Sequence, residues 1–319
     1  MIEEEKYAAA FLRLKMNRNR SRWPSVTLHA APYKPFMLLS VMDLIGEGVI
    51  TENRIFPSFE LAETFHGYCF QILPPGMKGN PAMPFYHLQS EGFWHLVPAD
   101  GFDHVPQVAA SSMLKIMETC RQAELDGSLF VLLQAPESRE RLRALLIQKY
   151  FDKDVQPKLF EQAVVNYNAE QYSRLLMAAE DRTAYIAPEI SITETKPIRG
   201  QGFRKTMVRI YEHRCAFCGI RMMTPDGHTV VDAAHIIPWS NSFDDSPQNG
   251  LCLCKLCHWS FDKKLMHLDN NYRIIVSSLV HVGGNLPGPI MSLDGRHMLL
   301  PDEQKYWPAK NNVEWHRLN

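Results

Sequence analysis

The sequence has almost no excess charge and no long hydrophobic run. Its 34 Lys and Arg residues oppose 35 Asp and Glu, for a formal net charge of −1. No overall basic field therefore attracts nucleic acid, and any nucleic-acid surface must be a local patch. The most apolar stretch, FMLLSVMDLI (36–45), is short and contains Asp43, which argues against a membrane span. The acidic, amphipathic start MIEEEKYAAAFLRLK does not have a signal-peptide pattern, so we expect a cytoplasmic location.

Cysteine is scarce, and its placement is uneven. The chain has 7 cysteines, of which four form two Cys-x-x-Cys pairs. Such pairing favours metal binding over disulfides, and we interpret the other three as buried thiols in a reducing compartment. The paired residues are Cys215, Cys218, Cys254 and Cys257.

The length and composition indicate two ordinary domains. The chain has 319 residues, of which 45% are hydrophobic, enough for real cores. Residues 181–202 are enriched in Pro, Gly, Ser and Thr, which is typical of a linker. We therefore predict an N-terminal domain over 1–180 and a C-terminal domain over 203–319.

The N-terminal domain is predicted to be mostly helical with short strands. Apolar spacing and charged faces favour the helices, and short aromatic runs around a turn favour the strands. The predicted helices are 3–16, 34–46, 58–70, 111–124, 136–150 and 156–179, and the predicted strands are 85–88 and 92–96.

The paired cysteines predict a structural zinc site. Zn²⁺ favours four soft ligands in a tetrahedron, and each Cys-x-x-Cys turn supplies two thiolates. The ion would close a long loop, and structural zinc contributes about 10–16 kcal/mol of apparent binding energy to folding. One alternative is a pair of redox-active or incidental thiol turns. In another, Cys252 replaces Cys254 as a ligand.

Three polar residues lie between or directly beside these pairs. VVDAAHIIPW has the apolar bias of a buried strand and carries His235, while Asn249 precedes Gly250 in a turn. CKLCHWSFDKK begins a helix on which His258 and Asp262, four residues apart, share one face. Alone, such a His is more often structural and such an Asn more often a turn former. Together, beside a zinc site, they suggest a catalytic centre.

This segment resembles the HNH nuclease family, the ββα-metal fold, over about residues 203–265. The motifs AHIIPW, NGLCL and CH..FD are similar to those of the predicted restriction-endonuclease branch of this family. The resemblance implies that His235 is the general base, that Asn249 fixes the catalytic loop and that His258 binds a catalytic Mg²⁺ or Mn²⁺. An imidazole suits the role of base because its unperturbed pKa lies near ~6.5.

One position departs from the family pattern. Many members carry a metal ligand directly before the base, where this chain has Ala234. Asp232 shares the strand face of Ala234 and is able to take over that role, with Asp262 as a further candidate. Basic residues near the centre are candidates for binding backbone phosphates, although a solvated charged face is an equal alternative. They are Arg204, Lys205, Arg209, Lys255, Lys263 and Lys264.

In the first half, YKPFMLL and NPAMPFYHLQSEGFWHL resemble the sulfur-recognising domain of McrA-type modification-dependent nucleases. The resemblance implies a pocket for phosphorothioate DNA. In it Lys34 binds the negative charge of the phosphorothioate group, and Pro84 forms an apolar wall with Phe85 or Tyr86 beside it. Tyr33 and Met83 depart from residues common in the family. The alternative is that this stretch only packs a small core.

These observations predict an α+β protein with a mostly helical reader domain and a zinc-stapled ββα-metal domain. The expected function is a restriction-type endonuclease that acts on double-stranded DNA, modified or not. Duplex cleavage needs two active sites, which a homodimer would supply. One alternative is a DNA-binding protein whose HNH core is inactive, and Ala234 is the feature that supports it. The others are a nuclease for RNA or branched DNA and a zinc module for protein contacts.

Overall fold

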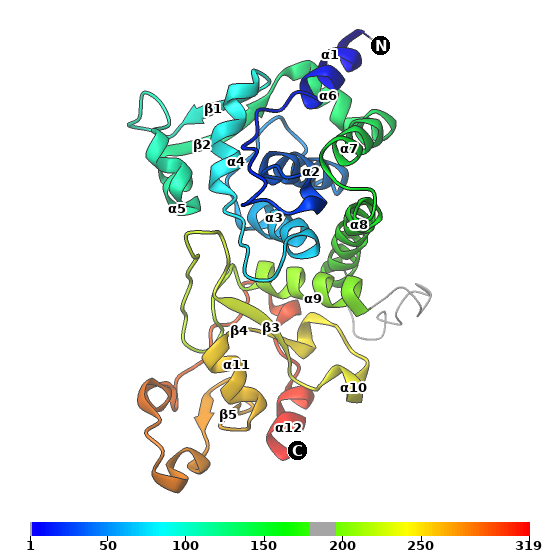
Figure 1. Ribbon diagram of the computed structural model, residues 1–319. Coiled ribbons are helices and arrows are strands. Elements are labelled where there is room, and N and C mark those ends of the chain that lie inside the picture. Colours follow the sequence, from blue (N-terminus) through cyan, green and yellow to red (C-terminus); the bar gives the residue numbers. More distant parts are fainter. Residues whose placement is uncertain (1, 179–195) are drawn as a thin grey trace. The chain divides into compact units, whose positions relative to one another are not determined.

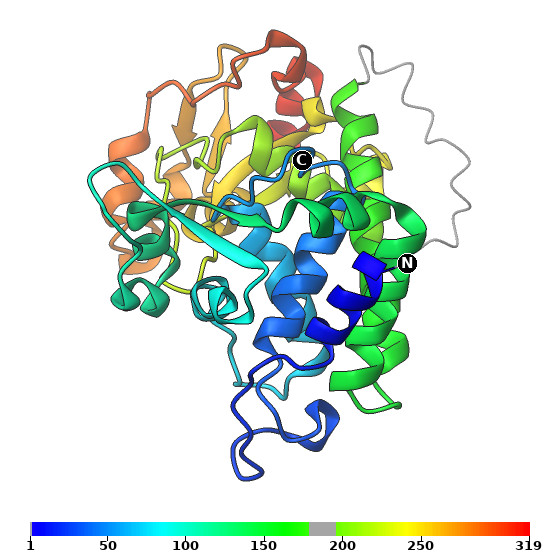
Figure 2. The same cartoon turned by 90° about the horizontal axis from the view of Figure 1, so that it is seen from above.

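A computed structural model describes residues 2–178 and 196–319 (Figure 1). The chain divides into two compact units. Unit 1 comprises Met1–Tyr167 and Met223–His228, and unit 2 comprises Asn168–Met222 and Thr229–Asn319. The α+β prediction is confirmed, with helices and short strands in both units (Figure 2). Among the described residues, no helix is both long and apolar enough to cross a membrane.

Unit 1 is built mostly of helices. Its helices are α1 (Ile2–Phe11), α2 (Tyr33–Gly46), α3 (Phe59–Ile72), α4 (Ala82–His87), α5 (Met113–Thr119), α6 (Gly127–Gln134), α7 (Pro136–Tyr150) and the first part of α8 (Gln156–Ala178). Strands β1 (Trp94–Pro98) and β2 (Cys120–Leu125) pair antiparallel.

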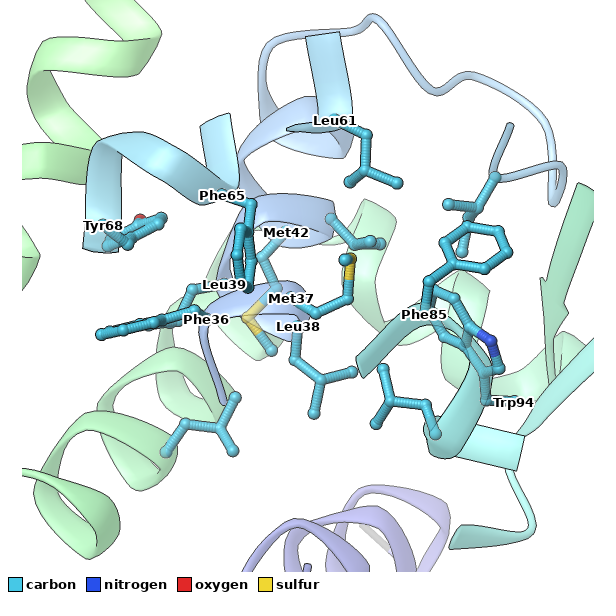
Figure 3. Close-up of a cluster of buried hydrophobic side chains, with 14 of the residues drawn as sticks. Phe36, Met37, Leu38, Leu39, Met42, Leu61, Phe65, Tyr68, Phe85 and Trp94 are labelled. Atoms are coloured by element: carbon cyan, nitrogen blue, oxygen red, sulfur yellow. The ribbon is translucent and has the colours of Figure 1, made fainter. Parts of the chain in front are cut away.

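Helix α2 forms the centre of this unit. It is apolar all round and packs against α3, α4, α6 and α7, as a buried helix does. Phe36 is fully buried and stacks on Tyr68, with ring centroids 6.1 Å apart (Figure 3). It also stacks on Phe151, with ring centroids 5.2 Å apart. The one acidic residue of this helix, Asp43, is buried but forms an ion pair with Arg143 at 2.6 Å. Burial of a carboxylate is tolerated here because a cation and hydrogen bonds compensate it.

Two secondary-structure predictions in unit 1 are wrong. Residues 85–88 form the end of α4 and the start of a 3₁₀ turn rather than a strand, and the Asn80 side chain accepts from Ala82 N near the helix start. The single helix predicted over 111–124 ends at Thr119, after which the chain pairs with β1. In the second case, tertiary pairing overrides a local helical pattern.

Unit 2 contains a ββα element. Its strands are β3 (Val231–His235), β4 (Gly250–Cys254), β5 (Met266–Leu268) and β6 (Ile274–Val276), and its helices are α9 (Lys196–Ile210), α10 (Trp239–Ser242), α11 (Lys255–Asp262) and α12 (Lys310–Leu318), with the end of α8. β3 pairs antiparallel with β4, so that His235 lies opposite Gly250. α11 follows β4 directly and packs against both strands, while α9 also contacts both.

The predicted linker 181–202 differs from the structure at its C-terminal end. Residues 196–202 belong to α9, and the remainder lies outside the described residues. Gly202 suggested a loop, but it has a packing role, because a Cβ there would lie 2.7 Å from the Ala169 carbonyl oxygen and 2.8 Å from the Tyr172 ring. Glycine thus allows α9 to approach α8 closely.

The C-terminal domain predicted over 203–319 is not one continuous stretch. Residues Met223–His228 belong to unit 1. There Met113 N donates to the Pro225 carbonyl oxygen at 2.8 Å, and Gly227 lies so close to Ala62 that a Cβ would be 2.6 Å from it. The difference arises because this segment between the first Cys pair and β3 packs as part of unit 1.

His316 makes unit 2 sensitive to acid. Its ring is buried and stacks on Phe261 at 3.6 Å, and burial, with a smaller effect of the Lys264 charge, lowers the pKa of His316 to about 3. The unfolded chain takes up this proton near pH ~6.5, so stability is expected to fall as the pH drops from ~6.5 towards 3, by up to ~1.4 kcal/mol per pH unit. Urea denaturation between pH 7.5 and 4.5 measures this loss.

The matched variants for this prediction are His316→Gln and His297→Gln. Removal of the buried imidazole is expected to flatten the pH dependence. His297 is exposed, and its removal should leave the slope unchanged. Equal slopes in the wild type and H316Q would contradict the prediction.

Candidate metal centre and active site

Four cysteines form a compact cluster in unit 2. Their Sγ atoms all lie within 4.8 Å of one another, and those of Cys218 and Cys254 are 3.7 Å apart. A tetrahedral zinc–thiolate site with bonds of about 2.3 Å implies sulfur separations of about 3.8 Å. The cluster therefore has the geometry of a metal-binding site, and it includes Cys254 rather than Cys252.

The turns of the chain explain how this cluster forms locally. Gly219 adopts a φ of +75° directly after Cys218, and Cys215 N donates to the Ile220 carbonyl oxygen at 2.9 Å. A left-handed glycine closes such a turn at little cost. Cys254 is the last residue of β4, and Cys257 lies in the first turn of α11. The second pair is therefore positioned by the strand-to-helix junction.

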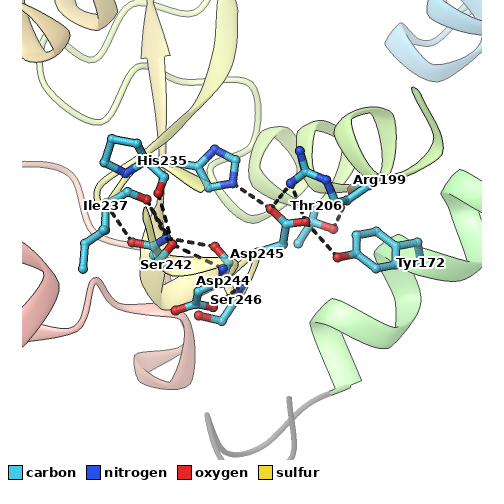
Figure 4. A network of polar contacts seen from close by, with 12 residues as sticks. Tyr172, Arg199, Thr206, His235, Ile237, Ser242, Asp244, Asp245 and Ser246 are labelled. Carbon is cyan, nitrogen blue, oxygen red and sulfur yellow. Dashed lines mark hydrogen bonds and ion pairs between the residues drawn. The ribbon is translucent and has the colours of Figure 1, made fainter. Parts of the chain in front are cut away.

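His235 is the last residue of β3, and its orientation is fixed from two sides. The imidazole stacks on Phe203 of α9, with centroids 4.0 Å apart and planes 12° apart. Its Nε2 lies 2.7 Å from Asp245 Oδ1 (Figure 4). Gly250 opposite permits this packing, because a Cβ there would lie 2.5 Å from the Met207 sulfur. The side chain of His235 remains 22% exposed, so a ligand is able to reach it.

Asp245 is the centre of a buried polar network (Figure 4). Its carboxylate is 1% exposed, and Arg199 Nη1 lies 2.8 and 2.9 Å from its two oxygens. Tyr172 donates its hydroxyl to Oδ2 at 2.8 Å. The sequence reasoning missed all three residues. The segment FDDSPQNG shows two adjacent acids without indicating which is buried, and Arg199 lay within the predicted linker.

Asn249 closes the loop between β3 and β4. It is fully buried, and its amide nitrogen donates to the carbonyl oxygens of Ile237 and Asp244 at 3.0 and 2.9 Å. Its amide oxygen accepts from Ile237 N at 2.9 Å and from Asn312 of α12 at 3.2 Å. This side chain therefore clamps the segment that follows His235. The contribution of Asn312 was not foreseen.

The predicted catalytic-metal ligands are distributed over two elements. His258 and Asp262 lie on α11 with Nε2 and Oδ2 3.6 Å apart. Asp232 on β3 forms an ion pair with Arg204 at 2.9 Å, and Ala234, on the same strand face, is buried. Among the described residues, the four cysteines are the one group of three or more His, Cys, Asp or Glu side chains close enough to hold an ion together.

Lys205 and Arg209, both predicted to contact DNA, form ion pairs within unit 2. Lys205 is 7% exposed, and both cations face Glu170 of α8, at 3.5 Å for Lys205 and 2.8 Å for Arg209. Burial raises the pKa of Glu170, but hydrogen bonding to Arg209 and the nearby positive charges lower it overall. The basic face of α9 is therefore used to pack α8 against α9. Lys263, by contrast, is exposed.

Unit 1 has a pocket of about 310 Å³ where the predicted reader residues meet. Lys34 and Pro84 both line it, together with Tyr33, Met83 and His87. Burial and the Lys34 charge lower the pKa of His87, which disfavours the charged form of that ring. The pocket has a largely apolar wall beside a buried cation.

Two parts of the pocket prediction need correction. Phe85 is fully buried and packs edge-on against Trp94, and Tyr86 does not line the pocket. Because α4 is a helix, Met83, Pro84 and His87 share the pocket face, while Phe85 points into the core. Lys34 is also already neutralised, since its Nζ pairs with Glu91 and donates to Ser90 Oγ at 3.1 Å.

Comparisons with known proteins match both parts of the chain. Residues 215–269 match the family model HNH_2, described as HNH endonuclease. Residues 60–166 match the model described as ScoMcrA-like, DNA sulfur-binding domain. Both resemblances predicted from the sequence are thereby confirmed.

No curated protein matches the chain. A solved structure titled "Modification dependent TagI restriction endonuclease" is similar at 21% identity with a TM-score of 0.30. The similarity covers 39% of this chain and 39% of that one.

Proposed function

We propose that this protein is an endonuclease directed to modified double-stranded DNA. One part of the chain matches HNH endonucleases, and another matches DNA sulfur-binding domains. The observation that carries the proposal is the placement of His235. It ends the first strand of a ββα element that also supplies two of the four clustered cysteines, and its imidazole is held by Asp245 and still accessible. A homodimer would supply the two active sites needed to cut both strands.

Zinc is the proposed occupant of the cysteine cluster. Four thiolates within tetrahedral distance match the ligand set of structural zinc, and softer ligands of this kind disfavour Mg²⁺. Zinc there joins the turn after α9 to the junction of β4 and α11. The ion would thus hold the ββα element together without taking part in the reaction.

In the proposed reaction, His235 removes a proton from water and the resulting hydroxide attacks the phosphorus in line. The 3′ oxygen leaves with the electron pair of the broken P–O bond. His258 and Asp262 are the proposed protein ligands of Mg²⁺ or Mn²⁺, which when bound neutralises charge that develops on the phosphate. Asn249 holds the loop after His235, and Lys263 is a candidate contact for a backbone phosphate.

The pocket of unit 1 is the proposed site for a phosphorothioate. A sulfur atom is larger and more weakly hydrated than oxygen, so an apolar wall of Met83 and Pro84 favours it. Because Glu91 neutralises Lys34, the discrimination rests more on apolar contact than the sequence suggested. Lys34 is then a positioned hydrogen-bond donor rather than a free cation.

The test of the proposed function is a side-by-side cleavage assay. Phosphorothioate, methylated and plain duplexes of one sequence are incubated with the full chain and Mg²⁺ or Mn²⁺. Metal-dependent cleavage with preference for the phosphorothioate duplex is the expected result. Cleavage of no duplex would overturn the proposed activity, and equal cleavage of all three would overturn the proposed selectivity.

Introduction of a negative charge at the pocket is expected to weaken binding of phosphorothioate DNA. Met83 lines the pocket and is 43% exposed, so Met83→Glu places a carboxylate beside the bound anion without disturbing the core. Like charges at close range in a partly desolvated site lower affinity by about 10-fold or more. Fluorescence anisotropy with phosphorothioate and plain duplexes measures the effect.

Gln89→Glu is the matched control for this variant. Gln89 is exposed and close in sequence, but it does not line the pocket. It adds the same charge, so it reports the general loss of DNA affinity. Equal effects of M83E and Q89E on both duplexes would count against the pocket as the sulfur site.

A second candidate function is DNA binding without cleavage. Ala234 is buried where a metal ligand is common, and Asp232 is engaged by Arg204, which leaves His258 and Asp262 as the remaining candidate ligands. Under this alternative, the chain binds phosphorothioate DNA but nicks no duplex at any concentration of Mg²⁺ or Mn²⁺.

A further inference from the structure

The contacts of Asp245 determine where the hydrogen atom of His235 lies. Arg199 Nη1 is within 2.9 Å of both carboxylate oxygens, and Tyr172 donates its hydroxyl to Oδ2. A guanidinium at this distance favours the ionised carboxylate, and an ionised carboxylate only accepts hydrogen bonds. The contact of 2.7 Å between Oδ1 and His235 Nε2 therefore requires that Nε2 carries the hydrogen.

We propose that Asp245 is a positioning residue that fixes His235 in its Nε2–H tautomer, so that Nδ1 is the atom that accepts the proton of the attacking water. The inference rests on the proposed nuclease function and assigns a role that the HNH motif residues do not cover. Within the described part of the chain, Asp245 is the partner found for the ring nitrogens of His235, and it engages Nε2. Nδ1 therefore keeps its lone pair.

The surroundings hold the ring in this one orientation. A 180° flip of the imidazole would bring a carbon atom to Asp245 and cost the hydrogen bond. Stacking on Phe203, with planes 12° apart, restricts tilting of the ring. In addition, Asp245 is 1% exposed, and its bonds to Arg199 and Tyr172 anchor it to α9 and α8. The carboxylate is thus as immobile as the helices that hold it.

The same contact stabilises the product of proton transfer. Water gives a proton to Nδ1 and its oxygen bonds to phosphorus, while the P–O3′ bond breaks and the 3′ oxygen takes a proton from solvent. His235 is then an imidazolium, whose Nε2–H donates to an anionic acceptor. Such a charge-assisted hydrogen bond is about twice as strong as a neutral one. Arg199 offsets the charge of Asp245 in the resting state, when the imidazole is neutral.

The first arm of the test is Asp245→Asn in the full chain, measured by single-turnover cleavage of the preferred duplex. The amide has the same shape, but it neither selects one tautomer nor stabilises the imidazolium. We expect the rate constant to fall about 100-fold, with unchanged DNA affinity and metal content.

The matched controls separate this inference from the proposed function. Asp302→Asn removes an exposed carboxylate from the same unit and should not change the rate. His235→Ala should lower the rate about 10³-fold or more. A D245N protein that keeps the wild-type rate while H235A loses it would overturn the role of Asp245 alone. Cleavage by H235A at the wild-type rate would overturn the nuclease mechanism itself.

The second arm does not depend on whether D245N folds. Nitrogen-15 spectra of the histidine-labelled wild-type protein, assigned by the signal that disappears in H235Q, report the tautomer directly. A protonated Nε2 and an unprotonated Nδ1 at pH 8 support the inference. A protonated Nδ1 with an unprotonated Nε2 overturns it.

Discussion

Replacement of His235 by alanine is expected to reduce DNA cleavage by about 10³-fold or more while leaving DNA binding intact. A positioned general base contributes about 10²–10⁴-fold to such a reaction, and Asp245 cannot substitute for it because its oxygens are already bound by Arg199 and Tyr172. The half-buried ring packs on Phe203 at the end of β3, so its truncation removes one stacking contact rather than a core residue. Single-turnover cleavage with Mg²⁺ or Mn²⁺, together with anisotropy on the same duplex, measures both quantities.

His297→Ala is the control for that experiment. His297 belongs to the same unit but is exposed. H297A should cleave at the wild-type rate. If H235A and H297A cleave equally well, the reaction does not use His235, and the proposed centre is wrong.

The second large effect is expected from Cys257→Ser, which should abolish tight zinc binding and unfold unit 2. Cys257 is buried in the first turn of α11, and a serine hydroxyl is a poor substitute for a thiolate ligand. The apparent binding energy of such a site is about 10–16 kcal/mol, more than the stability of a typical domain. Metal analysis, limited proteolysis and calorimetry of the full chain report the loss.

Two features make this prediction discriminating. Units 1 and 2 have separate hydrophobic cores, so the transition of unit 1 should survive in C257S. Cys252 lies on the same strand as Cys254 and is buried outside the cluster, so Cys252→Ala should retain one zinc per chain. A C257S protein with full zinc content and wild-type melting would show that the cluster does not bind the metal.

The ββα element and its metal cluster could be predicted because they are local. The two Cys-x-x-Cys turns, the strand that ends at His235 and the helix that begins after Cys254 lie within one short segment, where residue spacing largely fixes geometry. The pattern Asn-Gly likewise marks the turn that Asn249 closes. In this region sequence periodicity and tertiary structure agree.

The environment of His235 could not be predicted in the same way. Tyr172 and Arg199 reach Asp245 from positions 73 and 46 residues earlier in the chain. No local pattern marks a tyrosine on a long helix as a partner of one of two adjacent aspartates. Similarly, the basic residues Lys205 and Arg209 looked like phosphate contacts because their partner, Glu170, lies 35 and 39 residues away.

The pocket of unit 1 could be predicted only in part. Lys34 and Pro84 were placed in one pocket by resemblance, and the structure brings them together. Their neighbours were misassigned because a short apolar run such as Pro84–Leu88 fits a strand or a helix equally well. The choice of helix decides that His87 faces the pocket and Phe85 the core.

The bond between Asn312 and Asn249 has a consequence for biosynthesis. The two residues are 63 positions apart, so a chain leaving the ribosome exposes the loop that follows His235 well before the helix that secures this loop. Ala309 N, which donates to the Gln248 carbonyl oxygen at 2.9 Å, also emerges late. A nascent polypeptide therefore lacks this contact with the loop after His235 until translation has reached α12.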